Sequence, residues 1–104
     1  MQEIKEKFFE GEHALYGLSN AILENVTFGN GESPLKETKD LVIKNNIFKY
    51  KYPLWYSDNI KVTDSTFETM SRSGIWYINN ISIKNSNLQA PKLFRRCKHI
   101  SLDH

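Results

Sequence analysis

The chain has 104 residues, 25% of them charged and 39% hydrophobic, and a formal net charge of +2. A chain of this length forms a single domain, and its nearly balanced charge argues against nucleic acid as a partner. No apolar run approaches the ~20 residues of a membrane span, and the N-terminus lacks the pattern of a secretion signal, so no membrane partner is expected. The single cysteine, Cys97, rules out an internal disulfide and favours a reducing, cytoplasmic location.

Apolar residues recur along the chain with a period of about 20 residues. The first column of this repeat has spacings of 20, 19, 21 and 19 residues and comprises Leu15, Leu35, Leu54, Ile75 and Phe94. Two further apolar positions follow six and eight residues later, as in Leu41 and Ile43, and a fourth follows at Phe48. Side chains two positions apart lie on the same face of a strand, so each copy predicts a strand with one buried face. Near the N-terminus, Ile4 and Phe9 repeat the last part of the pattern.

This repeat predicts an all-β protein, a right-handed parallel β-helix of about five coils with 19–21 residues each. Each coil would contribute about three short strands separated by polar turns, and stacking would bury one apolar column. The chain is then a single domain over residues 1–104, with a partial coil at 1–12, repeating coils over 13–104 and an open C-terminal end. The alternative is a solenoid of the leucine-rich-repeat type. The leucine-rich repeat fits less well, because its asparagine comes three residues after the last strand leucine. Here the asparagine comes two residues after the last apolar residue of the strand.

Two polar columns flank the middle strand of the copies. The column before the strand holds Asn20, Asp40, Asn59, Asn80 and His99, and the column after it holds Asn25, Asn45, Asp64 and Asn85. Asn and Asp tolerate a left-handed backbone at a bend, and their side chains can bond from coil to coil. We therefore interpret both columns as turn residues. The three histidines are scattered along the chain, so neither a metal site nor a cofactor is expected.

Two columns of larger side chains follow the first apolar column. One holds Tyr16, Lys36, Trp55, Trp76 and Arg95, and the next holds Gly17, Glu37, Tyr56, Tyr77 and Arg96. A residue that follows a buried one along a strand points outward, so we expect an exposed ladder. At a coil spacing of about 4.8 Å, Trp55 and Trp76 should stack on each other. Arg95 should form a cation–π contact with Trp76.

The ladder has two interpretations. Aligned aromatic side chains commonly stabilise neighbouring strands, which would make the protein a structural or self-assembling module without a small ligand. Alternatively, the face binds an oligosaccharide, because sugar rings stack on aromatic rings and charged side chains bond their hydroxyl or carboxylate groups. The ligand-binding candidates under this hypothesis are Lys36, Glu37, Trp55, Tyr56, Trp76, Tyr77, Arg95 and Arg96.

Catalysis is the less favoured outcome. A glycoside hydrolase needs two carboxylates facing one cleft, and Glu37 is the only acid in the two ladder columns. Arg95, Arg96 and Lys36 would suit the acidic sugar of a polysaccharide lyase, but arginine is almost always protonated and makes a poor base. We therefore expect a binding protein, with a lyase-like enzyme as the third alternative and no catalytic residue assigned.

The segments GEHALYGLSNAILENVTF, ESPLKETKDLVIKNNIF, YPLWYSDNIKVTDSTF and LFRRCKHISL resemble a bacterial family of uncharacterised, pectate-lyase-like β-helix proteins. The resemblance runs along essentially the whole chain and implies the same right-handed β-helix, but no activity. Members of that family are generally longer, whereas this chain stops at ISLDH, within a coil. An open coil exposes an unpaired strand edge, so we expect a homo-oligomer formed through the C-terminal coil.

Overall fold

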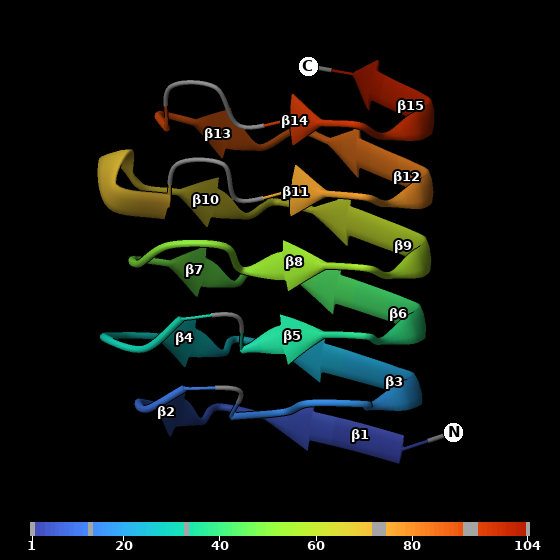
Figure 1. The fold of residues 1–104 in the computed structure, drawn as a ribbon. Helices are drawn as coiled ribbons and strands as arrows, with labels where there is room; N and C mark the ends of the chain where they lie inside the picture. The colour runs from blue at the N-terminus through green and yellow to red at the C-terminus, as the bar shows by residue number, and fades with distance from the viewer. Residues whose placement is uncertain (1, 13, 33, 72–74, 91–93, 104) are drawn as a thin grey trace.

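The computed structural model describes residues 2–12, 14–32, 34–71, 75–90 and 94–103, with Arg95 described by its backbone alone. Over these residues the chain winds into a stack of similar coils, and the strands of successive coils form three parallel sheets (Figure 1). The first strand lies at one end of the stack and the last strand at the other. Residues about 20 positions apart in the sequence therefore become neighbours in space.

The longest sheet has six parallel strands and contains the middle strand of each coil. Its strands, in order, are β1 (Gln2–Lys5), β3 (Ser19–Glu24), β6 (Lys39–Lys44), β9 (Asp58–Thr63), β12 (Asn79–Lys84) and β15 (Lys98–Asp103). The second sheet comprises β2 (Phe8–Phe9), β4 (Thr27–Phe28), β7 (Ile47–Phe48), β10 (Thr66–Phe67) and β13 (Asn87–Leu88). The third comprises β5 (Leu35–Lys36), β8 (Leu54–Trp55), β11 (Ile75–Trp76) and β14 (Phe94–Arg95).

The pairing of the strands confirms the alignment of the repeat. Ile60 of β9 pairs with Leu41 of β6 on one side and with Ile81 of β12 on the other. Leu54 and Ile75, which belong to the first apolar column, pair in the same way between β8 and β11. The predicted fold class, an all-β parallel β-helix of about five coils, is confirmed, and three sheets of parallel strands are the arrangement expected of it. Its right-handed sense stays a prediction, supported by the general preference for right-handed crossovers between parallel strands.

A single helical segment, the 3-10 turn Thr69–Ser71 (η1), lies among the described residues. Within those same residues, no helix is long and apolar enough to cross a membrane.

The core is one continuous column of apolar side chains between the sheets. In the four inner strands of the six-stranded sheet the third and fifth residues are buried, and in β6 these are Leu41 and Ile43, which are 1% and 0% exposed. Four phenylalanines stack from coil to coil through the second sheet, at centroid distances of 5.7, 5.1 and 4.6 Å along the series Phe9, Phe28, Phe48 and Phe67. Each such pair adds about 0.5–1.5 kcal/mol beyond the burial of the rings.

Both Asx columns act as turn residues, as predicted. Asn25 and Asn45 have φ of 56° and 52°, and the Nδ2 of Asn45 donates a 2.5 Å hydrogen bond to the Oδ1 of Asn25. In the other column, the Nδ2 of Asn59 donates to the Oδ1 of Asp40 at 2.8 Å. These bonds connect successive coils at both ends of the middle strands, just after β3 and β6 for Asn25 and Asn45, and at the second residue of β6 and β9 for Asp40 and Asn59.

Buried polar side chains inside the bends pair with backbone groups of the preceding coil. The Oδ1 of Asn46 accepts the backbone N–H of Val26 at 3.0 Å, and the Oγ of Ser65 accepts the N–H of Asn46 at the same distance. Ser86 does the same for the N–H of Ser65 at 3.1 Å. A buried N–H without a partner is costly, so the column of Asn46, Ser65 and Ser86 helps to hold the coils in register.

Candidate functional site

The predicted ladder lies at the bend between the third sheet and the six-stranded sheet. Four coils leave the third sheet through a residue with positive φ, namely Glu37 (55°), Tyr56 (51°), Tyr77 (54°) and Arg96 (52°), and Gly17 (75°) holds the same place in the coil before them. For residues other than glycine, the left-handed conformation costs roughly 1–2 kcal/mol, so contacts made by the side chain must offset it. The sharp turn places the side chains of these residues on the outside of the bend, next to the start of the middle strand that follows.

The two tryptophans are packing residues more than an open platform. Both are half-buried, and their rings meet edge to face at 88° with centroids 4.5 Å apart. The expected parallel stacking of Trp55 on Trp76 is therefore wrong. Its physical reason is Tyr52, from the loop before β8, whose ring packs against both indoles with centroids at 5.0 and 6.4 Å. The Nζ of Lys36 lies 5.5 Å from the centre of the Trp55 ring, so that ring has neighbours on several sides.

The two tyrosines of the next column form the parallel stack. The rings of Tyr56 and Tyr77 are inclined by only 4°, with centroids 4.9 Å apart, and these residues are 51% and 38% exposed. The guanidinium carbon of Arg96 lies 5.8 Å from the centre of the Tyr77 ring. A cation–π contact therefore exists one position later than predicted, between Arg96 and Tyr77. The predicted contact of Arg95 with Trp76 involves a side chain outside the described residues.

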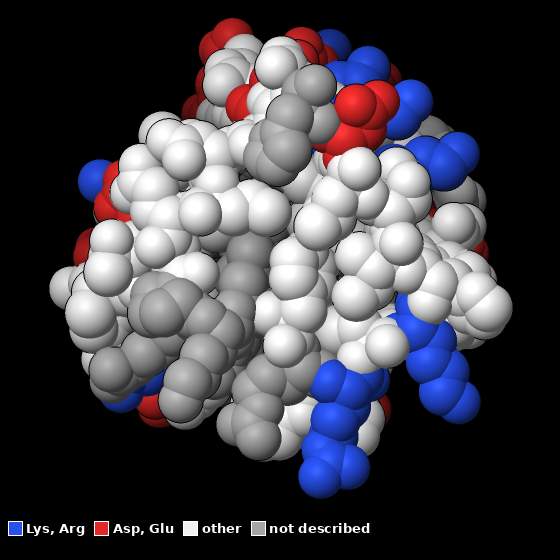
Figure 2. All heavy atoms as spheres, turned by 90° about the horizontal axis from the view of Figure 1, so that it is seen from above, with Lys and Arg blue, Asp and Glu red and all other residues white. Residues whose placement is uncertain are grey.

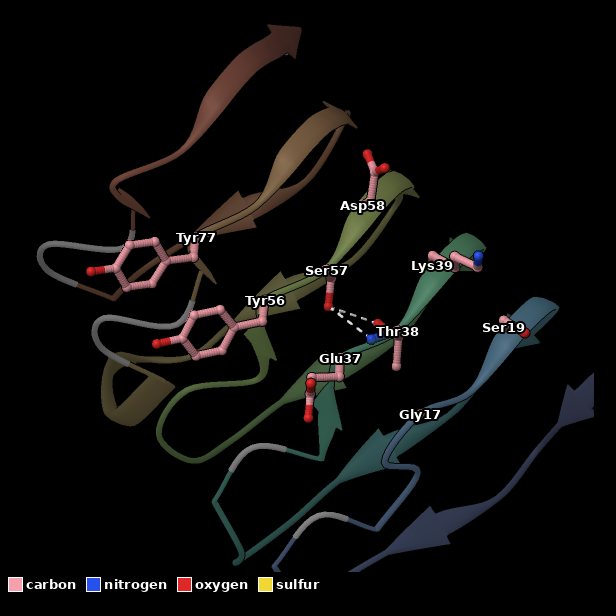
Figure 3. A pocket seen from close by; sticks show the side chains of 9 residues that line it. All are labelled: Gly17, Ser19, Glu37, Thr38, Lys39, Tyr56, Ser57, Asp58 and Tyr77. Carbon is pink, nitrogen blue, oxygen red and sulfur yellow. Dashed lines mark hydrogen bonds between the residues drawn. The ribbon is translucent and has the colours of Figure 1, made fainter.

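A shallow groove runs along this bend over several coils. Its first hollow has a volume of about 440 Å³ and is lined by Gly17, Ser19, Glu37, Thr38, Lys39, Tyr56, Ser57, Asp58 and Tyr77 (Figure 3). A second hollow of about 500 Å³ continues it and is lined by Tyr77, Ile78, Asn79, Arg96, Lys98 and His99. The two hollows share Tyr77. One wall is the ladder column of Glu37, Tyr56, Tyr77 and Arg96, and the other consists of the first residues of successive middle strands.

The floor of the groove is polar but internally paired. Thr38 and Ser57 are 2% and 4% exposed, and their hydroxyl oxygens lie 2.8 Å apart. The Oγ of Ser57 also accepts the backbone N–H of Thr38 at 3.2 Å and donates to the carbonyl oxygen of Leu35 at 3.1 Å. Groups that can bond a ligand are therefore those of the walls, in particular Lys39 and Asp58, which are exposed.

Charge is distributed unevenly along the groove. The first hollow contains Glu37, Lys39 and Asp58, whereas the second contains Arg96 and Lys98 and no acid among its lining residues. The carboxylates of Glu37 and Asp58 come from opposite walls and point away from each other (Figure 3). Glu37 also accepts a hydrogen bond from the hydroxyl of Tyr16. This is not the arrangement of two acids facing one scissile bond that a glycoside hydrolase requires.

No group of three or more His, Cys, Asp or Glu that would suit a metal ion occurs in the described part of the chain. Cys97 is half-buried, and its Sγ donates to the carbonyl oxygen of Ile75 at 3.2 Å.

The structure thus brings together part of the predicted set and adds to it. Glu37, Tyr56, Tyr77 and Arg96 line the groove, whereas Lys36, Trp55 and Trp76 are absent from its lining. The lining also includes residues that sequence reasoning missed, namely Ser19, Lys39, Asp58, Asn79 and Lys98. A signal for them existed, because they stand two positions after the ladder column in each coil. In the sequence these residues are simply the first residues of predicted strands, and the repeat does not indicate that the bend before them is concave.

A parallel β-helix with an aromatic ladder and a ligand-sized polar groove at one bend defines the class of protein. It is a β-solenoid with a shallow groove along one of its corners. The chain belongs to a family of proteins of unknown function, DUF3737, whose family model matches residues 2–104. The match agrees with the resemblance to an uncharacterised family, and the pectate-lyase-like character stays a prediction. Neither a curated protein nor a solved structure matches the chain significantly.

Proposed function

We propose that the protein binds carbohydrate in the groove beside Tyr56 and Tyr77. The observation that carries the proposal is the exposure of two stacked tyrosine rings on the wall of a groove whose hollows measure about 440 and 500 Å³. Volumes of 300–1,000 Å³ are typical of small-molecule sites. A sugar offers an apolar C–H face to an aromatic ring and hydroxyl groups to polar walls, and this groove has both kinds of surface.

The polar wall supports the same ligand class. Lys39 can donate to a sugar hydroxyl, Asp58 can accept from one, and Asn79 can do both. Arg96 and Lys98, in the second hollow, place positive charge beside the first hollow and would favour an acidic glycan over a neutral one. The resemblance to pectate-lyase-like proteins adds to the proposal. On a separate ground, the single cysteine, we also propose a cytoplasmic location.

Binding without turnover is the form of the proposal, because no pair of groove carboxylates faces one point. A lyase-like reaction needs a base at the sugar, and the candidate bases among the described lining residues are Glu37, Lys39, Asp58, Lys98 and His99. An assay that follows the unsaturated product of uronide cleavage would detect such a reaction directly. A structural module without ligand is the second candidate, and the dense packing of Trp55, Trp76 and Tyr52 favours it.

Intrinsic fluorescence provides the test. The chain has two tryptophans, and the ring of Trp55 lies 5.8 Å from that of Tyr56, so a ligand on the tyrosine should alter the emission. We expect a saturable shift with at least one member of a panel of neutral and acidic oligosaccharides. The shift should disappear in Tyr56→Leu and persist in the control Tyr50→Leu, which changes a tyrosine that is not among the groove-lining residues. Absence of any shift, or its persistence in Tyr56→Leu, would leave the structural module as the better explanation.

A further inference from the structure

The tyrosine stack has two ends, and only a ring face at an end can receive a ligand. Within a parallel stack, each ring covers a face of its neighbour. Tyr56 and Tyr77 are parallel to within 4° and cover each other in this way. At the C-terminal end, Arg96 lies over the ring of Tyr77, and Trp76 stacks against the same ring with centroids 5.4 Å apart. The C-terminal end of the stack is therefore occupied by side chains of the protein.

The N-terminal end is different, because the column continues without rings. The next positions toward the N-terminus are Glu37 and Gly17, and both line the first hollow together with Tyr56 (Figure 3). A Cβ atom placed on Gly17 would have no neighbour within 4 Å, which shows that this part of the column is open space. Tyr56 is correspondingly more exposed than Tyr77, at 51% against 38%.

The tryptophans do not provide a second platform of this kind. Trp55 is half-buried, has Lys36, Tyr52 and the edge of Trp76 against it, and its indole nitrogen is buried without a hydrogen-bond partner among the described residues. A ligand could not reach that nitrogen without displacing the packing.

We infer that the groove takes a single pyranose unit, stacked on the face of Tyr56 that is turned away from Tyr77, in the hollow lined by Glu37 and Gly17. The ligand class is then a terminal or side-chain sugar of a glycan, not an extended stretch of polysaccharide lying along the ladder. This inference rests on the proposed function. Ser19 and Lys39 line the hollow and are the groups that would bond the hydroxyls of the stacked unit, because the carboxylate of Glu37 already accepts the hydroxyl of Tyr16.

Length dependence tests the inference. Methyl glycosides of glucose, galactose and N-acetylglucosamine, and the oligosaccharides of two to four units that end in each sugar, would be titrated by calorimetry. One stacked unit predicts that the best tetrasaccharide binds within about threefold of its methyl glycoside, a difference of less than 1 kcal/mol. A gain of about tenfold or more over the series would indicate that further units contact the ladder, and it would overturn the inference while carbohydrate binding itself stood.

A ring added to the column gives the sharper test. Glu37→Tyr places a third tyrosine at a position with the φ that Tyr56 and Tyr77 already adopt, so it should extend the stack and cover the face of Tyr56. We expect an unfolding midpoint equal to or above that of the wild type together with a loss of affinity of about tenfold or more. Because stability does not fall, the loss cannot be attributed to misfolding.

The matched control is Glu37→Gln, which removes the charge but leaves the ring face open. Its affinity should stay within about fivefold of the wild type, since an amide oxygen can still accept the hydroxyl of Tyr16, though less strongly than a carboxylate does. Equal binding by Glu37→Tyr and the wild type would overturn the inference. If no sugar binds to the wild-type chain at all, the proposed function falls as well.

Discussion

The ring of Tyr56 lies parallel to the ring of Tyr77, with centroids 4.9 Å apart, although 21 positions separate the two residues in the sequence. The solenoid converts a sequence period into a spatial stack, so that one residue type repeated in a column produces a continuous surface. The same geometry stacks phenylalanines in the core, asparagines at the corners and tyrosines at the groove. What differs between these stacks is exposure, and exposure determines which of them can meet a ligand.

The tryptophans are predicted to matter more for stability than for binding. Trp76→Ala removes contacts with Trp55, Tyr52 and Tyr77 and should lower the free energy of unfolding by about 1–3 kcal/mol, less than for a fully buried indole. Denaturation in urea measures the change. Tyr56→Ala is the comparison, because its ring is half exposed and its loss should cost less. If Trp76→Ala left stability unchanged but abolished sugar binding, the original hypothesis that the tryptophans bind the sugar would be supported instead.

The phenylalanine stack should be the most sensitive part of the core. Phe48 is fully buried between Phe28 and Phe67, with centroids at 5.1 and 4.6 Å. Phe48→Ala should cost about 3–5 kcal/mol, since it leaves a cavity and removes two ring contacts. The control is Phe8→Ala, on the outer face of β2, where the ring is 59% exposed and the expected change is small. Equal effects of the two substitutions on the urea midpoint would show that stacking does not dominate the core.

Asn46 is predicted to hold two coils together through its Oδ1. Asn46→Ala leaves the buried N–H of Val26 without its partner and should destabilise the protein by about 1–3 kcal/mol. Asn46→Ser is the matched variant, because Ser65 and Ser86 already fill this role in later coils through their hydroxyl oxygens. It should recover part of the lost stability. Thermal unfolding of both variants checks this, and identical midpoints would mean that the side-chain oxygen is unimportant.

The fold could be predicted because the repeat consists of apolar residues two positions apart, and the alternation of side chains along a strand places such residues on one buried face. Aligning Leu41 with Ile60 and Ile81 gave the strand register that the structure has. The Asx columns were equally readable, since few residues other than Asn, Asp and Gly adopt positive φ readily. For these positions, the chemistry of a single residue was enough to specify its place.

The site was less predictable, because it depends on side chains outside the repeat. Tyr52 belongs to a loop without a column, yet its ring is what fixes the tryptophans edge to face. Lys39 and Asp58 begin strands, and they become walls of a groove only because the left-handed residues Glu37 and Tyr56 bend the chain just before them. Both effects require knowledge of torsion angles that a pattern of apolar residues does not contain.

Association through the last strand stays a prediction, and it can be tested on the chain of 104 residues. Ile100 and Leu102 of β15 are 40% and 49% exposed, whereas the equivalent Ile81 and Ile83 of β12 are 1% and 3% exposed. Figure 2 shows the stack from the β15 end, where Lys and Arg lie toward the rim. The exposed side chains of the edge strand and its unpaired backbone groups should favour dimers or larger species in sedimentation. Leu102→Lys should dissociate them, because a charge would be buried at the contact. Ser101→Lys, on the opposite face of the same strand, should not. A wild-type chain that sediments as a monomer over the micromolar range would contradict the prediction.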